Sequence, residues 1–164
     1  MKLEVLTLDQ CQMVREWRNE RLETLRTSYR ITEQMQEEFY DKISRRDSPH
    51  RYYAIMDGGL FLGMGGLTNI QWENRTAEIS LILKNENEHD RRRVYELLFD
   101  EGFANMGLLT TTGEVYQCND LEPMIKKIIE GFGGYTTEMI GRKFWDGKLY
   151  NATWFGVISD VYKQ

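Results

Sequence analysis

One stretch of the chain decides the fold: Thr76-Ala-Glu-Ile-Ser-Leu-Ile-Leu-Lys-Asn85, then Glu86-Asn-Glu-His-Asp-Arg-Arg-Arg93, then Val94-Tyr-Glu-Leu-Leu-Phe-Asp-Glu-Gly-Phe-Ala-Asn-Met-Gly107. Apolar residues alternate along the first segment, which predicts a strand over residues 76–84. A charged loop follows. The third segment, with the end of the loop, predicts the longest helix, from about Asp90 to Met106, and Gly107 is its natural stop.

Toward the N-terminus, the patterns predict a strand, two helices and a hairpin. Thr32 is a suitable N-cap for the second helix, because an apolar stripe at i, i+4 and i+8 follows it. Asp57-Gly58-Gly59 is a hairpin signal. The expected elements are a strand from Lys2 to Leu8, a helix from about Asp9 to Leu25, a helix with the stripe Met35, Phe39 and Ile43, and strands Arg51–Met56 and Leu60–Ile70.

Toward the C-terminus, a strand from Thr110 to Cys118 leads into a helix that Asn119 or Asp120 can cap, with Pro123 in its first turn. Two closing strands, about 135–144 and 148–158, follow. The order is β-α-α-β-β-β-α-β-α-β-β, which predicts one mixed α/β domain over residues 1–164 with a central mixed sheet flanked by helices. The strand–helix–strand crossover predicts that strands 76–84 and 110–118 are parallel neighbours, splayed at their C-terminal ends.

Composition narrows the class of protein. The 164 residues carry a net charge of −5, so no broad basic surface for nucleic acid is expected. The apolar runs are too short for a membrane span, and the N-terminus does not resemble a signal peptide. Cys11 and Cys118 lack metal-type spacing and are expected to be reduced thiols. These features predict a cytoplasmic protein without a bound metal, a nucleic-acid partner or a membrane partner.

Short motifs spread over the chain carry a family resemblance. In order, they are Trp17-Arg18-Asn19, Leu62-Gly63-x-Gly65-Gly66-Leu67, Asn74-Arg75-x-Ala77-Glu78-Ile79, Gly102-Phe103, Gly107-Leu108, Asn119 and Trp145-Asp146-Gly147-Lys148-x-Tyr150. Together they resemble the GCN5-related N-acetyltransferases, and within them the enzymes that acetylate ribosomal-protein N-termini or amino-sugar nucleotides. The segment Ser48-Pro-His-Arg-Tyr52 is similar to the amino-sugar branch. The resemblance implies acetyl transfer from acetyl-CoA to a primary amine.

The loop of the deciding stretch departs from this family. Family members carry Arg/Gln-x-x-Gly-x-Gly/Ala there, and its backbone N–H groups hold the pyrophosphate of acetyl-CoA. An ungapped alignment on Phe103 puts that loop on residues 86–91, yet no glycine occurs from Leu67 to Glu101. Acidic residues oppose an anionic ligand here, whereas arginines in the first helical turn favour one. Two interpretations stay open: a weaker, compensated acetyl-CoA site, or a charged helix start without a ligand.

The resemblance also implies site residues. Strand N–H groups near Leu81, Ile82 and Leu83 would meet the cofactor and the developing oxyanion. The expected cofactor contacts are Leu81, Ile82, Leu83, Glu88, His89, Asp90, Arg91, Arg92 and Asn119; the expected acceptor contacts are Trp17, Arg18, Asn19 and Trp72.

For catalysis, Glu78 is a candidate base for an ammonium acceptor, with Ser80 on the same face to orient water. The alternative for Glu78 is a structural carboxylate paired with an arginine. The family's general acid, a tyrosine after the Asn cap, falls here at Lys126 or Lys127. A lysine is a poor acid unless it is desolvated, and both lysines also fit the solvent face of an amphipathic helix.

Two functions follow from these residues. The first is an acetyl-CoA-dependent N-acetyltransferase whose acceptor is a small-molecule or protein amine, such as an amino sugar or a protein N-terminus. The second is a catalytically silent protein of the same fold that has lost normal acetyl-CoA binding. The chain is expected to be a monomer or homodimer.

Overall fold

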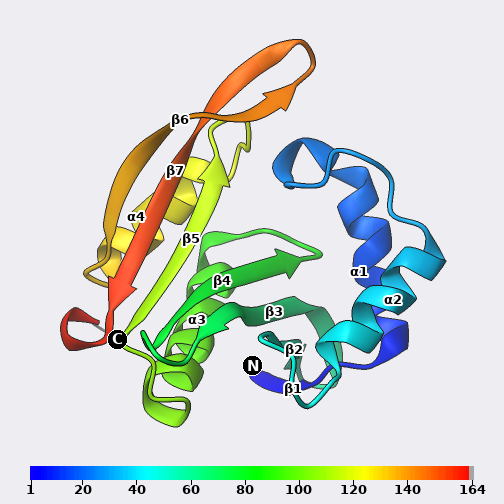
Figure 1. Cartoon of the computed structure of the whole chain (residues 1–164), viewed down its shortest axis with the longest axis horizontal. Coiled ribbons are helices and arrows are strands. Elements are labelled where there is room, and N and C mark those ends of the chain that lie inside the picture. Colours follow the sequence, from blue (N-terminus) through cyan, green and yellow to red (C-terminus); the bar gives the residue numbers. More distant parts are fainter. Residues whose placement is uncertain (163–164) are drawn as a thin grey trace.

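The computed structural model describes residues 1–162, which form one seven-stranded sheet in the order β1-β2-β3-β4-β5-β7-β6 (Figure 1). The expected element order is confirmed. The β4–β5 pair is parallel and every other pair in the sheet is antiparallel. The elements are β1 Lys2–Val5, α1 Leu8–Glu20, α2 Glu33–Ile43, β2 Arg51–Asp57, β3 Leu60–Gln71, β4 Thr76–Leu83, α3 Glu88–Asp100, β5 Thr110–Tyr116, α4 Glu122–Gly131, β6 Tyr135–Trp145 and β7 Lys148–Ile158.

Local capping sets the ends of the first two helices. The Thr7 side chain accepts a hydrogen bond from the Gln10 backbone N–H, and Gln10 reciprocates, so α1 begins at Leu8. The prediction that this helix continues to Leu25 is wrong. Arg21 leaves the helical conformation (φ −134°, ψ 48°), and a short 3₁₀ turn replaces the last turns. The predicted Thr32 cap of α2 is confirmed, since its hydroxyl accepts from Met35 at 3.2 Å.

The later helices differ from expectation at their starts. Helix α3 begins at Glu88 because the Asn87 side chain accepts the Asp90 N–H at 2.9 Å. It ends in a π-helical turn before Gly107, whose φ of +69° suits glycine. Neither predicted residue is the N-cap of α4. The Asn119 side chain instead accepts from the Leu121 N–H at 3.0 Å, in the turn before the helix.

The sheet separates two apolar layers. Side chains of α1 and α2 pack on one face, where Ile82 of β4 joins Val14 and Phe39. Helices α3 and α4 cover the other face, where Ile79 and Leu81 of β4 contribute (Figure 1). Even-numbered β4 residues therefore face α1 and α2, and odd-numbered ones face α3 and α4. No helix within residues 1–162 is long and apolar enough to cross a membrane.

The predicted splay between β4 and β5 is confirmed. The two strands pair only over Thr76–Glu78 and Thr110–Thr112, at their N-terminal ends. Beyond that point β4 stays with β3 and β5 stays with β7, so the two strands diverge (Figure 1). The sheet therefore has an opening beside the C-terminal half of β4.

Candidate active site

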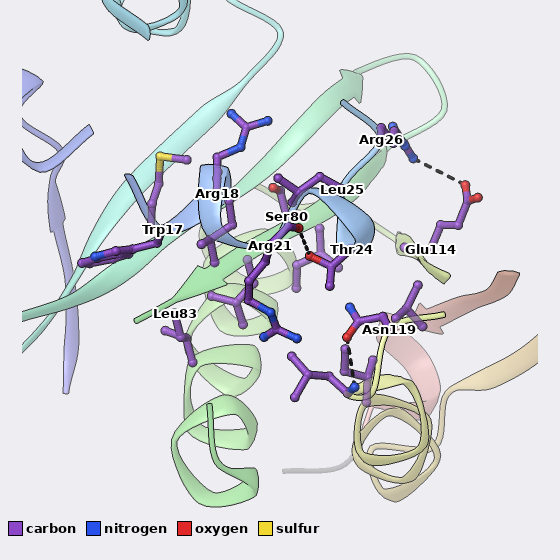
Figure 2. A pocket seen from close by; sticks show the side chains of 18 of the residues that line it. Trp17, Arg18, Arg21, Thr24, Leu25, Arg26, Ser80, Leu83, Glu114 and Asn119 are labelled. Atoms are coloured by element: carbon purple, nitrogen blue, oxygen red, sulfur yellow. Dashed lines mark hydrogen bonds and ion pairs between the residues drawn. The ribbon is translucent and has the colours of Figure 1, made fainter. Parts of the chain in front are cut away.

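A cavity of about 750 Å³ occupies the opening between the diverging strands. It extends from α1 and the segment that follows it, across β4 and β5, to the residues before α3 and α4. Figure 2 shows side chains from α1, the segment after it, β4, β5 and the turn before α4 around this cavity. Residues that reach it from distant parts of the chain include Trp17, Arg26, Glu78, Glu114 and Asn119.

The backbone of β4 presents a free edge to this cavity. The Lys84 N–H donates to the Leu62 carbonyl of β3 at 3.0 Å. Because antiparallel partners alternate, the even-numbered β4 residues bond to β3 and the odd-numbered ones turn their N–H and C=O groups the other way. The expected backbone contacts at Leu81 and Leu83 therefore face the opening, whereas the backbone of Ile82 faces β3. Ile82 is nonetheless among the residues that line the cavity.

Two carboxylates and one guanidinium form the acceptor end of the cavity. The Arg26 side chain lies 3.2 Å from Glu78. It also lies 3.6 Å from Glu114, and a dashed line marks this pair in Figure 2. Glu114 is nearly buried and also pairs with Arg142 at 3.1 Å. Glu78 thus lines the cavity, as expected for a base. It is also paired with an arginine, as expected for the alternative of a structural carboxylate.

Ser80 lies one step along the same face as Glu78 and also lines the cavity. Its partner is Tyr52 of β2. Burial raises the pKa of Tyr52, while the hydrogen bond with Ser80 opposes that rise. The Tyr52 hydroxyl therefore remains protonated and can serve as a neutral donor or acceptor beside Ser80.

Of the four expected acceptor contacts, two line the cavity and two do not. Trp17 lines the cavity and stacks on Phe61 with ring centroids 5.6 Å apart. Arg18 also lines it; burial lowers the pKa of Arg18, and its Nε is buried without a hydrogen-bond partner among the described residues. Asn19 lies outside the cavity lining and bonds both backbone groups of Ile31. Trp72 is in the exposed turn after β3, also outside that lining.

The expected pyrophosphate loop is filled by internal contacts. Arg91 is buried and forms two hydrogen bonds to the Glu86 carboxylate and one to the Tyr95 hydroxyl. Burial disfavours the charged form of Arg91, but Tyr95 and Glu86 outweigh it and raise its pKa. Asn87 occupies the Asp90 N–H, as described above. At this helix start, the Asp90 and Arg91 N–H groups and the Arg91 side chain are therefore already bonded within the chain.

Neighbouring charges in this region are also paired or exposed. Glu88 accepts the Lys127 ammonium at 2.7 Å and 2.9 Å. The Arg92 guanidinium lies over the Phe132 ring, 4.2 Å from its centroid. His89 is exposed. The expected phosphate contacts through Arg91 and Arg92 thus have other partners in this structure.

The expected general acid is not brought to the cavity. Helix α4 turns Leu121 and Ile125 toward it, and both lie in its lining. Lys126 is exposed and Lys127 is paired with Glu88. Because consecutive residues point about 100° apart on a helix, the apolar face takes the cavity side and the lysines take the solvent side. Both lysines therefore fit the alternative prediction, in which they lie on the solvent face of an amphipathic helix.

Three further residues shape the acceptor end: Arg26, Glu114 and Lys143. Lys143 of β6 is buried and donates to Ser28 Oγ at 2.8 Å and to the Leu22 and Leu25 carbonyls. Its burial lowers its pKa, and the Tyr116 and Trp145 rings lie under the ammonium. Of these three residues, only Glu114 could have been predicted from the sequence. Glu78 pairs with Thr112 of the parallel strand β5, and Glu114 lies two residues further along the same face of β5.

No protein-family model and no curated protein matches the chain, but solved structures do. A spermidine N-acetyltransferase from Vibrio cholerae in complex with CoA and spermine superposes with a TM-score of 0.87 at 18% identity, covering 98% of this chain and 96% of that chain. A mutant form of a spermidine/spermine N-acetyltransferase from Vibrio cholerae gives 0.83 at 18% identity, over 98% and 95%. A dodecameric structure of the spermidine enzyme gives 0.80 at 17% identity, over 97% and 94%. The chain therefore has the fold of the GCN5-related N-acetyltransferases.

Proposed function

We propose that the chain is an acetyl-CoA-dependent N-acetyltransferase whose acceptor is a primary amine on a cationic molecule of the polyamine class. One observation carries this proposal. The free backbone edge of β4 and the Glu78 carboxylate belong to one strand and open into one cavity, so a group bound along the edge would lie beside a carboxylate that can accept a proton.

The residues fit one part of acetyl-CoA better than another. The amide-bearing arm can pair with the backbone groups of Leu81 and Leu83, as an added strand would. The phosphates would meet a helix start whose side chains are already paired. Lys84 and Asn85 are exposed and line the cavity near that end. We expect these two residues, rather than Arg91 and Arg92, to approach the phosphates.

In this reaction the chain has two roles: it accepts a proton from the acceptor and stabilises the charge that develops on the acetyl oxygen. Acetyl-CoA supplies the acyl group as a thioester. Glu78 accepts a proton from the acceptor ammonium, directly or through a water held by Ser80, and this frees the nitrogen lone pair for attack. N–H groups of the β4 edge donate hydrogen bonds to a carbonyl oxygen that gains negative charge. The products are an N-acetyl amine, a CoA thiol and the proton that remains on Glu78 until solvent removes it.

The charge at the acceptor end favours a cationic acceptor. Glu78 and Glu114 both lie there, and since Arg142 already pairs with Glu114, Glu78 is the carboxylate left for an incoming ammonium. A structural neighbour contains spermine and CoA together, which fits this choice. Arg18 also lines the cavity, and its cation would suit an amino-sugar nucleotide with its phosphates. The polyamine is preferred because Glu78, the expected base, lies at the acidic end.

A thiol-release assay with acetyl-CoA tests the proposal. The amine panel is spermine, spermidine, a peptide with a free N-terminus and an amino-sugar nucleotide. Saturable turnover with spermine or spermidine is expected, together with mass-spectrometric detection of the monoacetyl product. Turnover with the peptide or the sugar alone would overturn the acceptor class, and the absence of turnover with every amine would overturn the activity.

The second candidate is a catalytically silent protein of this fold that binds the amine. The filled helix start, with its Glu86–Arg91 and Glu88–Lys127 pairs, favours it. Calorimetry separates the two candidates. The silent protein would bind spermine without measurable binding of acetyl-CoA, whereas the enzyme must bind both.

A further inference from the structure

Arg26 occupies the position that the proposed acceptor would need. Its guanidinium lies within 3.2 Å of Glu78 and 3.6 Å of Glu114, which belong to the two parallel strands β4 and β5. Glu78 is the residue proposed to receive the acceptor's proton. An ammonium cannot approach its carboxylate closely while the guanidinium of Arg26 is bound to it, because like charges at hydrogen-bonding distance repel.

The segment that carries Arg26 is attached at other residues. Arg21 bonds to Asp120 at 2.7 Å, Cys118 Sγ contacts the Glu23 carbonyl at 3.4 Å, and Lys143 holds the carbonyls of Leu22 and Leu25. The Arg26 side chain itself is well exposed. It can therefore leave the two carboxylates by rotation of its own side chain, without release of the segment.

We infer that Arg26 is an internal competitor of the acceptor: it fills the cation position between Glu78 and Glu114 in the free protein and leaves it when the amine binds. This inference rests on the proposed function for the class of acceptor. Its quantitative consequence is that every acceptor that must reach Glu78 loses apparent affinity by the same factor, the fraction of protein in which Arg26 has moved away.

The test is calorimetric titration of spermine and of spermidine into the full chain, without acetyl-CoA. Arg26→Gln keeps the length of the side chain and removes its charge. Arg30→Gln is the matched control, because Arg30 is also an exposed arginine of the same segment but lies outside the lining of this cavity. An exposed ion pair of this kind predicts about threefold to fivefold tighter binding by Arg26→Gln, equal for both amines, and little change for Arg30→Gln.

Three results would overturn the inference. Equal gains in the two variants would mean that only the long-range charge changed. Weaker binding by Arg26→Gln would mean that Arg26 holds the acceptor. The absence of binding in all three proteins would mean that the cavity does not take these polyamines, so that Arg26 has nothing to compete with. Since acetyl-CoA is absent, acetyl transfer can fail while the competition is observed, and turnover of spermine can be found while the competition is not.

A second measurement follows Arg26 directly in the wild-type protein. In wild-type protein with ¹⁵N-labelled arginine, the Nε–H signal of Arg26, assigned from its loss in Arg26→Gln, should shift as spermine is added. The signal of Arg91 should not move, because Arg91 is buried against Glu86. An unmoved Arg26 signal at saturating spermine would overturn the inference.

Discussion

The two ends of the cavity each place an arginine against glutamate, but with opposite consequences. At the acceptor end, the Arg26 side chain is 60% exposed and reaches Glu78 and Glu114 from a separate segment. At the phosphate end, the Arg91 side chain is 5% exposed and the Glu86 side chain is 13% exposed. These two residues lie only five positions apart in the sequence. Exposed ion pairs contribute little to stability, whereas removing one member of a buried pair is costly. A ligand can therefore displace the first arginine far more easily than the second.

This difference explains how one fold can keep an acceptor site while its cofactor loop changes. The Glu86–Arg91 pair fixes the loop into α3 as a structural element, with Tyr95 extending the contact into the core. The acceptor end keeps the charges of Arg26 and Glu78 near solvent and within reach of an incoming cation. The predictions below each alter one end and leave the other in place.

The largest effect is expected at Glu78. In an enzyme that acetylates spermine, Glu78→Gln should lower turnover by about 10²–10⁴-fold, because the amide cannot accept the ammonium proton. Lys126→Ala and Lys127→Ala should retain most of the activity, since neither side chain lines the cavity. Steady-state kinetics at saturating acetyl-CoA measure this. Full turnover by Glu78→Gln would remove the proposed base, and a comparable loss in Lys126→Ala would restore that lysine as the acid.

The next effect concerns the phosphate end. Arg91→Met should lower the free energy of unfolding by about 3–5 kcal/mol, because Glu86 and the Tyr95 hydroxyl would lose their shared partner in a buried site. Arg93→Ala is the control: its pair with Glu96 is more exposed, and a change of about 0–1 kcal/mol is expected. Urea unfolding followed by circular dichroism gives both values. If Arg91→Met were as mild as Arg93→Ala, the contrast between the two ends would fail.

A smaller effect is expected where Lys143 holds the segment of the acceptor end. Lys143→Met keeps the stem of the side chain but removes the ammonium that binds Ser28 and the Leu22 and Leu25 carbonyls. Trypsin should then cleave after Arg26 several-fold faster, while cleavage after Arg75 serves as the internal reference. Peptide mapping over time measures both rates. Unchanged cleavage after Arg26 would mean that Arg21 and Cys118 suffice to hold the segment.

Periodicity and turn residues predicted the sheet well, because they act within a few residues. The parallel pairing of β4 and β5 followed from the strand–helix–strand order, and the Thr32 cap followed from its spacing to an apolar stripe. Helix ends were less certain. Leu22 to Leu25 continue a helical composition, yet the chain turns there because its polar groups find partners in Lys143 and Cys118, which are about a hundred residues away.

The site was predictable only in part for the same reason. Glu78 and Trp17 were found because the family motifs fall on them. Arg26 has no such motif, and its role depends on a long-range contact to Glu78 and Glu114. The acidic loop was predicted to depart from the family pattern, but its composition did not show that Arg91 turns inward to Glu86 rather than outward to a ligand. Burial, which decides that question, is a property of the folded chain.

The smallest effect is expected for the affinity of acetyl-CoA when α3 loses an arginine. We expect weak binding overall, with a free energy of about −5 to −6 kcal/mol, because the loop lacks glycine, the Asp90 N–H is bonded to Asn87 and Arg91 is paired with Glu86. Arg92→Ala should change the dissociation constant by no more than about twofold, since Arg92 packs on Phe132 instead of facing the cavity. The salt dependence should be shallow for the same reason.

Lys84→Ala is the comparison variant, and it should weaken binding more than Arg92→Ala does. Calorimetry at low and high salt measures all three proteins. A tenfold loss in Arg92→Ala, or low-micromolar affinity of the wild type, would show that the phosphate end opens to its ligand as the acceptor end does.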